Sequence, residues 1–511
     1  MANNNSYDKF YSANKRLLNE TETNLECSVN LESDEQVTKV LAVDVSGNIQ
    51  NTECLQGEAN VNGMLFISVV FATESGLVGN TSYIAPFVSK ISDSSLKPDS
   101  KIFAKVNSCD VEVSSINSNI AKIECNVKVK AYCYHNEEVS FLSETGEDVC
   151  FKQDNVEYYT YNNSQTGEWT ESLEALIKEP VQKVLSSTSA VNLKSAECGA
   201  GFVSLNCEVV NKLTYLSMEE NSQIKTVYTK QDVKQEVECQ NVTSDSKVEV
   251  DLYIAKQNEK TEVEDKDSEV KVCTFVPLVA CLHVFDKNSV NVITDLYSTT
   301  NYTLVSTSSY NSTQVCSPIV FEKKVEGSLT LSEEEPRIDK LLAVNYSKVI
   351  VTNEFLSNGE YSLSGVVTSN LIYFNEDDSV PCSVDVEIPF VVTTQTELEG
   401  EHLLDLNVSV KDVDVMVKKG RDVFVDATVC VYTNVCKESS SAVISELEYK
   451  EELPNKDCAI EIYFAKAGEK VWDIAKGLNI KPEKIYAQNP DISEILESDQ
   501  KLAIYYQKNQ K

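Results

Sequence analysis

Residues 39–72 read KVLAVDVSGNIQNTECLQGEANVNGMLFISVVFA, and two later stretches follow the same pattern. The second begins at Lys183 with KVLSSTSAVNLKSAEC, and the third begins at Lys340 with KLLAVNYSKVIVTNEF. In each copy the Lys-Val/Leu-Leu opening is followed by a Glu at the same distance, by a loop with Gly, and by an alternating run that ends in aromatic residues. Such self-similarity is typical of a repeated structural unit. The matching glutamates are Glu53, Glu197 and Glu354.

The later part of each copy also alternates between apolar and polar residues. The third copy has LLDLNVSVKDVDVMV, then the turn KKGRD, then VFVDATVCVYTNV. Alternation with a period of two predicts half-buried strands. We therefore expect a mainly β protein with three antiparallel β-sandwich-like domains at 32–153, 173–321 and 336–437, the second being the most divergent. We expect an Asn-rich, partly disordered lead-in at 1–31 and linkers near 154–171, near 322–336 and at 438–458.

Charge and cysteine usage narrow the class of protein. The 511 residues include 80 acidic and 45 basic ones, for a formal net charge of -35. This field repels nucleic acid and anionic lipid surfaces, so we expect neither as a partner. No signal-peptide run follows Met1 and no segment is long enough to span a membrane, so we expect a cytoplasmic protein. The 16 cysteines fit buried, reduced thiols.

The repeats contain no sequence motif that indicates a catalytic site. The patterns G-x-x-x-x-G-K, G-x-S-x-G and H-E-x-x-H do not occur, and there is no Cys-x-x-Cys pair. The three histidines, His135, His283 and His402, fall at unrelated places in the copies. We therefore expect a scaffold or binding protein with no enzymatic activity, no metal site and no cofactor.

The last fifty residues follow a different pattern. Residues 460–465 alternate as a strand, and the apolar residues Val471, Ile474, Ala475 and Leu478 have the spacing of one helix face. Pro482 suits the first turn of a second helix that ends by Pro490. Residues 501–506 predict a closing strand. The order is strand–helix–helix–strand, at 459–507.

The ordered motif of this segment resembles a LysM domain. In that family the loop after the first strand and the loop before the last strand form a shallow groove for N-acetylglucosamine-containing glycans. The resemblance implies groove residues Gly468, Glu469 and Lys470 on one side and Asn489, Pro490, Asp491 and Ile492 on the other. It implies a core of Val471, Trp472, Ile474, Ala475 and Ile485.

Three residues depart from the LysM pattern: Glu469, Lys470 and Asp499, which stands where the family usually has Gly before Gln-x-Leu. The family usually has Gly-Asp-Thr where this chain has Gly468-Glu469-Lys470. Asp is a good helix N-cap and Glu is not, so we expect the first helix to lose about 0.5–1 kcal/mol of capping. Lys470 also changes the bulk and charge of one groove wall. Glycan binding and protein binding remain two open interpretations of this module.

The combined layout resembles clostridial spore envelope morphogenetic proteins of the SipL type, which carry repeated SPOCS domains and end in a LysM domain. Ala85-Pro86-Phe87 and Ile388-Pro389-Phe390 also match the style of SPOCS domains. The resemblance implies a non-catalytic spore coat assembly factor in the mother-cell cytoplasm, at the forespore surface. Its partners would be the coat basement ATPase, stage IV sporulation protein A, bound through the LysM domain, and other coat proteins. The alternative is a protein of the cell wall or spore cortex whose LysM domain binds peptidoglycan.

Overall fold

The computed structural model describes residues 5–117, 119–218, 224–266, 269–375, 380–454 and 458–506. The chain is mainly β with several antiparallel sheets, as the alternation predicts. Parts of the predicted segments lie outside the described residues: 1–4 of the lead-in, 118 of the first predicted domain, 219–223 and 267–268 of the second, 376–379 of the third, 455–457 of the linker and 507 of the C-terminal module.

Each of the three similar stretches forms the first two strands of a three-stranded antiparallel sheet. The Lys-Val/Leu-Leu opening lies in the first strand, and the alternating run is the central strand. Between them, Gly57 and Gly359 turn the chain with φ values of 80° and 74°, which glycine adopts without strain. In sheet order, the strands are β3 (Val37–Leu55), β4 (Glu58–Thr73), β5 (Val78–Ser92); β11 (Ile224–Glu238), β10 (Phe202–Ser217), β9 (Val181–Cys198); and β17 (Ile338–Ser357), β18 (Glu360–Asn375), β19 (Cys382–Gln395).

Three long strands each organise a four-stranded sheet in the part of the chain that the structure describes. They are β7 (Ile120–Glu144), β14 (Glu269–Ser298) and β21 (Asp422–Glu452). A 3-10 turn, η1 (Lys256–Asn258), joins two of the partner strands. The partners are β1 (Ser6–Leu17), β2 (Thr21–Asn30) and β6 (Lys101–Asn117) for β7; β8 (Val149–Ile177), β12 (Lys247–Ile254) and β13 (Lys260–Lys266) for β14; and β15 (Asn301–Val315), β16 (Ile319–Thr330) and β20 (Leu403–Lys418) for β21.

Each three-stranded sheet shares a hydrophobic core with one four-stranded sheet. Leu65 and Ile67 of β4 belong to the same cluster as Ile123 and Val127 of β7. Corresponding clusters join β10 to β14 and β18 to β21. Buried apolar residues from two facing sheets are the packing of a β-sandwich.

The segments predicted as linkers are strands in the structure. Residues 154–171 lie inside β8, 322–330 lie in β16, and 438–452 are the last part of β21. Most of the predicted lead-in forms β1 and β2, which pair with β7. These segments carry many polar side chains, and their backbones are paired along most of their length. Sequence alone shows the polarity of the side chains but not the strand on which the backbone pairs.

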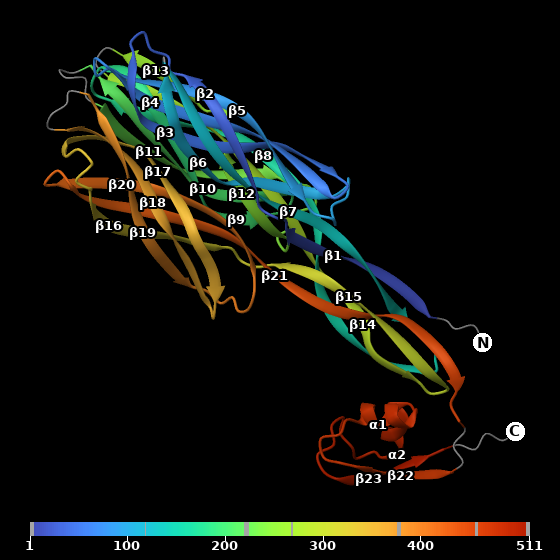
Figure 1. Cartoon of the computed structure of the whole chain (residues 1–511). Helices are drawn as coiled ribbons and strands as arrows, with labels where there is room; N and C mark the ends of the chain where they lie inside the picture. Colours follow the sequence, from blue (N-terminus) through green and yellow to red (C-terminus); the bar gives the residue numbers. More distant parts are fainter. Residues whose placement is uncertain are drawn as a thin grey trace.

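Beyond the sandwiches, three two-stranded ribbons pack together and form what we call the stalk (Figure 1). They are β1 with 132–144 of β7, 149–160 of β8 with 286–298 of β14, and β15 with 436–452 of β21. Phe10 lies at the centre, with its ring 4.5 Å from Tyr158 and 5.2 Å from Tyr310. Because the three ribbons bury their apolar side chains against one another, each of them needs the other two. The cluster around Phe10 also contains Val139, Phe141, Val292 and Val443, and a second cluster of the stalk contains Leu142, Val149, Ile293, Leu296, Ile444 and Leu447.

The openings of the three similar stretches also meet. Leu41, Leu185 and Ala343 belong to one buried cluster, and Leu342 packs against it. This cluster lies among the three-stranded sheets rather than inside any single sandwich, since its members come from β3, β4, β9, β10, β11, β17 and β18. The shared Lys-Val/Leu-Leu pattern therefore supplies contacts between the three parts of the chain.

The chain ends in β22 (Ile460–Ala465), α1 (Val471–Leu478), α2 (Pro482–Gln488) and β23 (Gln500–Tyr505), which we call the C-terminal module. These bounds agree with the predicted strand–helix–helix–strand order to within a residue or two. Val471, Ile474, Ala475 and Ile485 are buried together with Leu502 and Ile504 of β23. The module lies beyond the end of the stalk (Figure 1).

Candidate functional site

Backbone contacts bring the two predicted groove loops side by side. Gly468 N–H donates to the carbonyl of Leu496 at 2.7 Å, and Val471 N–H donates to the carbonyl of Glu494 at 2.9 Å. Lys470 forms an isolated antiparallel bridge with Ile495. Gly468 has φ of 88°, and nothing lies within 4 Å of the position that a β-carbon would take. The loop after β22 and the loop before β23 therefore share one exposed surface.

The predicted groove residues differ in how free their side chains are. Gly468, Lys470, Pro490 and Asp491 are exposed, while Ile492 packs against the apolar core of the module. The carboxylate of Glu469 accepts a hydrogen bond of 3.0 Å from the backbone N–H of Lys466. The open part of this surface is thus made of a glycine, a proline and two opposite charges.

The side chain of Asn489, a predicted groove residue, makes hydrogen bonds to the backbone inside the module. Its side-chain amide donates to the carbonyls of Ile485 and Ala503 and accepts from Ala503 N–H, each at 3.0 Å. This leaves little hydrogen-bonding capacity for a ligand, since an amide side chain offers two donors and one acceptor oxygen. Asn489 joins the end of α2 to β23.

The N-cap of α1 is Lys470, not Glu469. Lys470 has φ of -90° and ψ of 136°, and its side chain makes no capping hydrogen bond. The first helical residue is Val471, so the missing N-cap hydrogen bond belongs to Lys470 and not, as the sequence predicted, to Glu469. Lysine cannot accept a hydrogen bond, so it cannot serve the free N–H groups of the first turn.

Trp472 faces the stalk as well as the core of the module. Its indole Nε1 donates a hydrogen bond of 2.6 Å to Asp295 of β14, and its ring lies edge-on to Tyr297 at 5.2 Å. Lys476 forms an ion pair with the same Asp295. Tyr297 in turn donates from its hydroxyl to the carbonyl of Ile480 at 2.6 Å. These contacts attach the module to the ribbon made by β8 and β14.

The electrostatics of this attachment favour a charged Asp295. Partial burial opposes ionisation, but the hydrogen bonds from Lys476 and Trp472 outweigh it and hold the pKa of Asp295 below its usual value. Burial raises the pKa of the Tyr297 hydroxyl, which keeps it a hydrogen-bond donor. Asp295 and Tyr297 were not predicted from the sequence, because the alternation in β14 indicates a half-buried strand and does not show which of its side chains contact α1.

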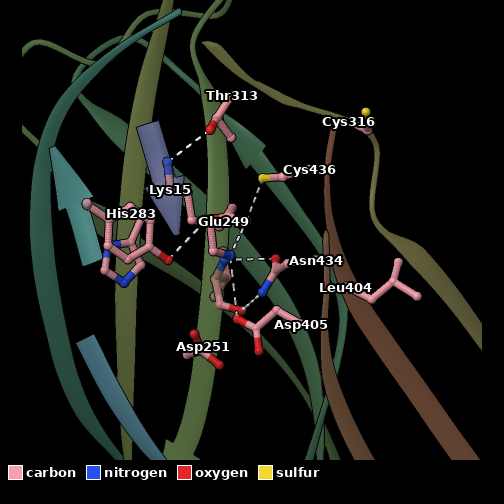
Figure 2. A network of polar contacts seen from close by, with 12 residues as sticks. Lys15, Glu249, Asp251, His283, Thr313, Cys316, Leu404, Asp405, Asn434 and Cys436 are labelled. Carbon is pink, nitrogen blue, oxygen red and sulfur yellow. Dashed lines mark hydrogen bonds and ion pairs between the residues drawn. The ribbon is translucent and has the colours of Figure 1, made fainter. Parts of the chain in front are cut away.

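A second polar cluster joins residues of β1, β12 and β20, and Figure 2 shows its side chains. Lys15 of β1 is fully buried, with its Nζ 2.7 Å from Glu249 of β12 and 3.8 Å from Asp405 of β20. Lys105 of β6 pairs with Asp405 and, at 3.1 Å, with Asp251. The chain thus places lysines from its first part against carboxylates from its second and third parts.

Positions that correspond in the three parts carry complementary side chains here. Lys105, Asp251 and Asn407 are each the fifth residue of their strands, β6, β12 and β20. Lys105 Nζ lies 3.2 Å from Asn407 Oδ1, and Asn407 Nδ2 donates to Asp251 at 3.2 Å. A cation, an anion and an amide satisfy one another, whereas three identical charged residues would repel. The arrangement distinguishes the three parts from one another.

Burial sets the proton affinities in this cluster. It disfavours the charged forms of Lys15 and Asp405. Glu249 and Asp405 outweigh burial for Lys15, whose pKa is raised, and Lys105 and Lys15 outweigh it for Asp405, whose pKa is lowered. Burial lowers the pKa of His283 to about 4, although Glu249 opposes this shift. The His283 ring stacks on Tyr134 at 4.3 Å. Lys15, Glu249, Asp405 and His283 are all buried, and the two ion pairs of Lys15 lie inside the cluster.

The other residues singled out from the sequence do not gather at one site. Glu53 and Glu197 are exposed, and Glu354 accepts a hydrogen bond of 2.8 Å from Tyr361. His283 is buried, while His402 is partly exposed, with its Nδ1 3.0 Å from the carbonyl oxygen of Gly400. The described ranges contain no group of three or more His, Cys, Asp or Glu side chains placed to bind a metal ion.

No protein-family model, no curated protein and no solved structure matches this chain. None of the helices in the described ranges combines the length and the apolar character that crossing a membrane requires. The exposed surfaces of the C-terminal module are the candidate site.

Proposed function

We propose that this chain is a non-catalytic spore envelope assembly factor that tethers the coat to the forespore. In this proposal the C-terminal module is a LysM domain that binds the coat basement ATPase, stage IV sporulation protein A. The protein works at the forespore surface in the mother-cell cytoplasm, and its β-rich part contacts other coat proteins. The identity of the partner rests on the resemblance to SipL-type proteins.

Three repeated domains form the scaffold in this proposal. The order of strands in the three parts supports the repeat: a three-stranded sheet comes first, then β6, β20 or the pair β12 and β13, and then a long strand, β7, β21 or β14. The meeting of Leu41, Leu185 and Ala343 gives the shared opening a common role in packing. The repeats then begin at β1, β8 and β15, which pair with the long strands β7, β14 and β21. Each repeat therefore includes segments that the sequence predicted as lead-in or linker.

The observation that carries the proposal is the attachment of the module to the end of the stalk. Asp295 and Tyr297 contact Trp472 and Ile480, which covers the α1 side of the module. Its loops and the outer face of its two-stranded sheet remain exposed. A small binding module at the far end of a long, acidic scaffold suits a tether, because the two ends can engage different layers.

Binding of the purified ATPase tests this function directly. We expect the full chain, and a control chain that ends at residue 506, to bind the ATPase with similar affinity. A chain that ends at residue 452 retains β21 but lacks the module, and we expect it to lose binding. Equal binding by all three chains would contradict the proposal.

The exposed loops support glycan binding as a second candidate function. Gly468 leaves open space, and Lys470, Pro490 and Asp491 lie exposed on the two adjacent loops. Sedimentation of the full chain with purified peptidoglycan tests this candidate. Lys470→Ala and Asp491→Ala should reduce the sedimented fraction several-fold if the loops bind glycan. Asn489 is a poor choice for this test, because its amide joins α2 to β23.

A further inference from the structure

Among the residues that the structure describes, the two edges of the β22–β23 sheet differ in whether their outward backbone groups have hydrogen-bond partners. Along β23, side chains at the end of α2 replace a neighbouring strand. Gln488 donates to the carbonyl of Tyr505 at 3.2 Å and accepts from its N–H at 2.9 Å. Asn489 does the same for Ala503 at 3.0 Å. This edge is therefore closed by two side-chain amides.

The edge of β22 is open in the described part of the chain. Tyr506 N–H donates to the carbonyl of Ala459 at 3.0 Å, and Glu461 lies opposite Ile504. Because alternate residues of an antiparallel pair bond inward, Glu461, Tyr463 and Ala465 direct their N–H and C=O groups toward β23. The backbones of Ile460, Ile462 and Phe464 then point away from it. Within the described residues, β22 pairs with β23 and with no other strand.

The same three residues expose their side chains. Ile460 is 52% exposed, Ile462 is 48% exposed and Phe464 is 68% exposed. Tyr505 lies opposite Ile460 on β23 and is 49% exposed. Proteins usually protect open edges with lysine, proline or a bulge, and the three outward positions of β22 have none of these. An open edge with apolar side chains beside it is a site for strand addition.

We infer that β22 binds an extended segment of a partner protein, which adds as a further strand along the free edge. This inference rests on the proposed function and names the surface through which the module binds. The occupant carries apolar side chains at alternate positions, which lie against Ile460, Ile462 and Phe464. Lys466 and Lys501 lie at the Phe464 end, with Lys501 Nζ 5.3 Å from the Phe464 ring, so we expect an acidic residue at that end of the segment.

The size of the surface favours a segment over a second copy of this chain. Four partly exposed side chains offer roughly a few hundred Å² of contact, since a whole aromatic side chain buries about 150–250 Å². Stable dimers bury about 1,200–2,000 Å². Five residues of β22 span about 16 Å, which is enough for a short strand. The α1 face offers no alternative, because Trp472 and Lys476 already contact Asp295.

Two variants of the full chain test the inference with the purified ATPase. Ile462→Lys combined with Phe464→Lys places charges on the open edge, and both sites are exposed, so the module should stay folded. We expect this double variant to bind at least tenfold more weakly. The control is Val391→Lys, because Val391 is 70% exposed and lies on β19, another strand at a sheet edge. We expect the control to bind like the original chain.

Hydrogen exchange of the complex provides a second measurement. Strand addition should slow amide exchange in residues 458–465, because the N–H groups of Ile460, Ile462 and Phe464 gain acceptors. Unchanged exchange there, or unchanged affinity of the folded double variant, would overturn the inference. If loss of the module abolishes binding while the edge variant binds normally, the proposed function stands and strand addition at β22 is contradicted. If loss of the module has no effect, both are wrong.

Discussion

Trp472 donates a hydrogen bond of 2.6 Å to Asp295, which lies 177 positions earlier in the chain. The module follows β21 in sequence, yet it attaches to the ribbon that contains β14. Asp295 also pairs with Lys476, so one carboxylate contacts two residues of the same helix. This relationship determines which face of the module remains exposed.

Replacing Asp295 with alanine should weaken this attachment. Hydrogen bonds to charged groups contribute about 1.5–3 kcal/mol, but Asp295 is 36% exposed and Lys476 is 43% exposed, so screening reduces their ion pair. We expect a net loss of about 1–2 kcal/mol. Acrylamide quenching of tryptophan fluorescence should increase. Asp154→Ala is the control, since Asp154 is exposed on the neighbouring strand; equal quenching in both variants would contradict the role of Asp295.

Lys15→Met should strongly destabilise the whole chain. It leaves Glu249 buried without its cation, while Asp405 keeps its ion pair with Lys105. Breaking a buried pair in this way costs about 3–5 kcal/mol. The double variant Lys15→Met with Glu249→Met removes one charge of each sign and should recover much of the loss. Urea unfolding of the single and double variants measures this coupling. Additive losses would show that the two residues do not depend on each other.

Stability should fall as the pH decreases from about 6.5 to about 4, and His283 should contribute to this fall. Its pKa is about 4 in the folded chain and 6.5 when unperturbed, so the unfolded state binds the proton first as pH falls. The stability contributed by neutral His283 is complete above pH 6.5 and is lost through this window, on the order of 3 kcal/mol. The measurement is the urea concentration at the midpoint of unfolding between about pH 4 and 6.5. His283→Gln should make this midpoint depend less on pH, while His402→Gln should leave its pH dependence unchanged.

Lys470→Ser should stabilise α1. The backbone of Lys470 already has the extended conformation of an N-cap, and serine offers the acceptor oxygen that lysine lacks. We expect a gain of about 0.5–1 kcal/mol, seen as slower amide exchange in the first turn of α1. Lys466→Ser removes the same charge from an exposed position outside the helix. If both variants slow exchange equally, the effect comes from charge rather than capping.

Much of the local structure could be predicted from the sequence. Alternation indicated strands such as β4 and β18, and the spacing of Val471, Ile474 and Ala475 indicated α1. The predicted linkers were strands instead, because a segment with many exposed polar residues still pairs through its backbone. The buried cluster was not predicted either. In β12, Val250 is in a sandwich core, and Glu249 and Asp251 alternate with it, which suggests a solvent-facing surface.

The sequence by itself determined the strand pattern, the three similar stretches and the strand–helix–helix–strand order of the C-terminal module. These depend on side-chain periodicity and on turn residues, which act over a few positions. Only the tertiary structure decided that the polar faces of β6, β12 and β20 meet in a buried cluster, that Trp472 contacts Asp295, and that β22 keeps an open edge. Such features depend on which distant segments come together, and alternation within one strand carries no information about its partner.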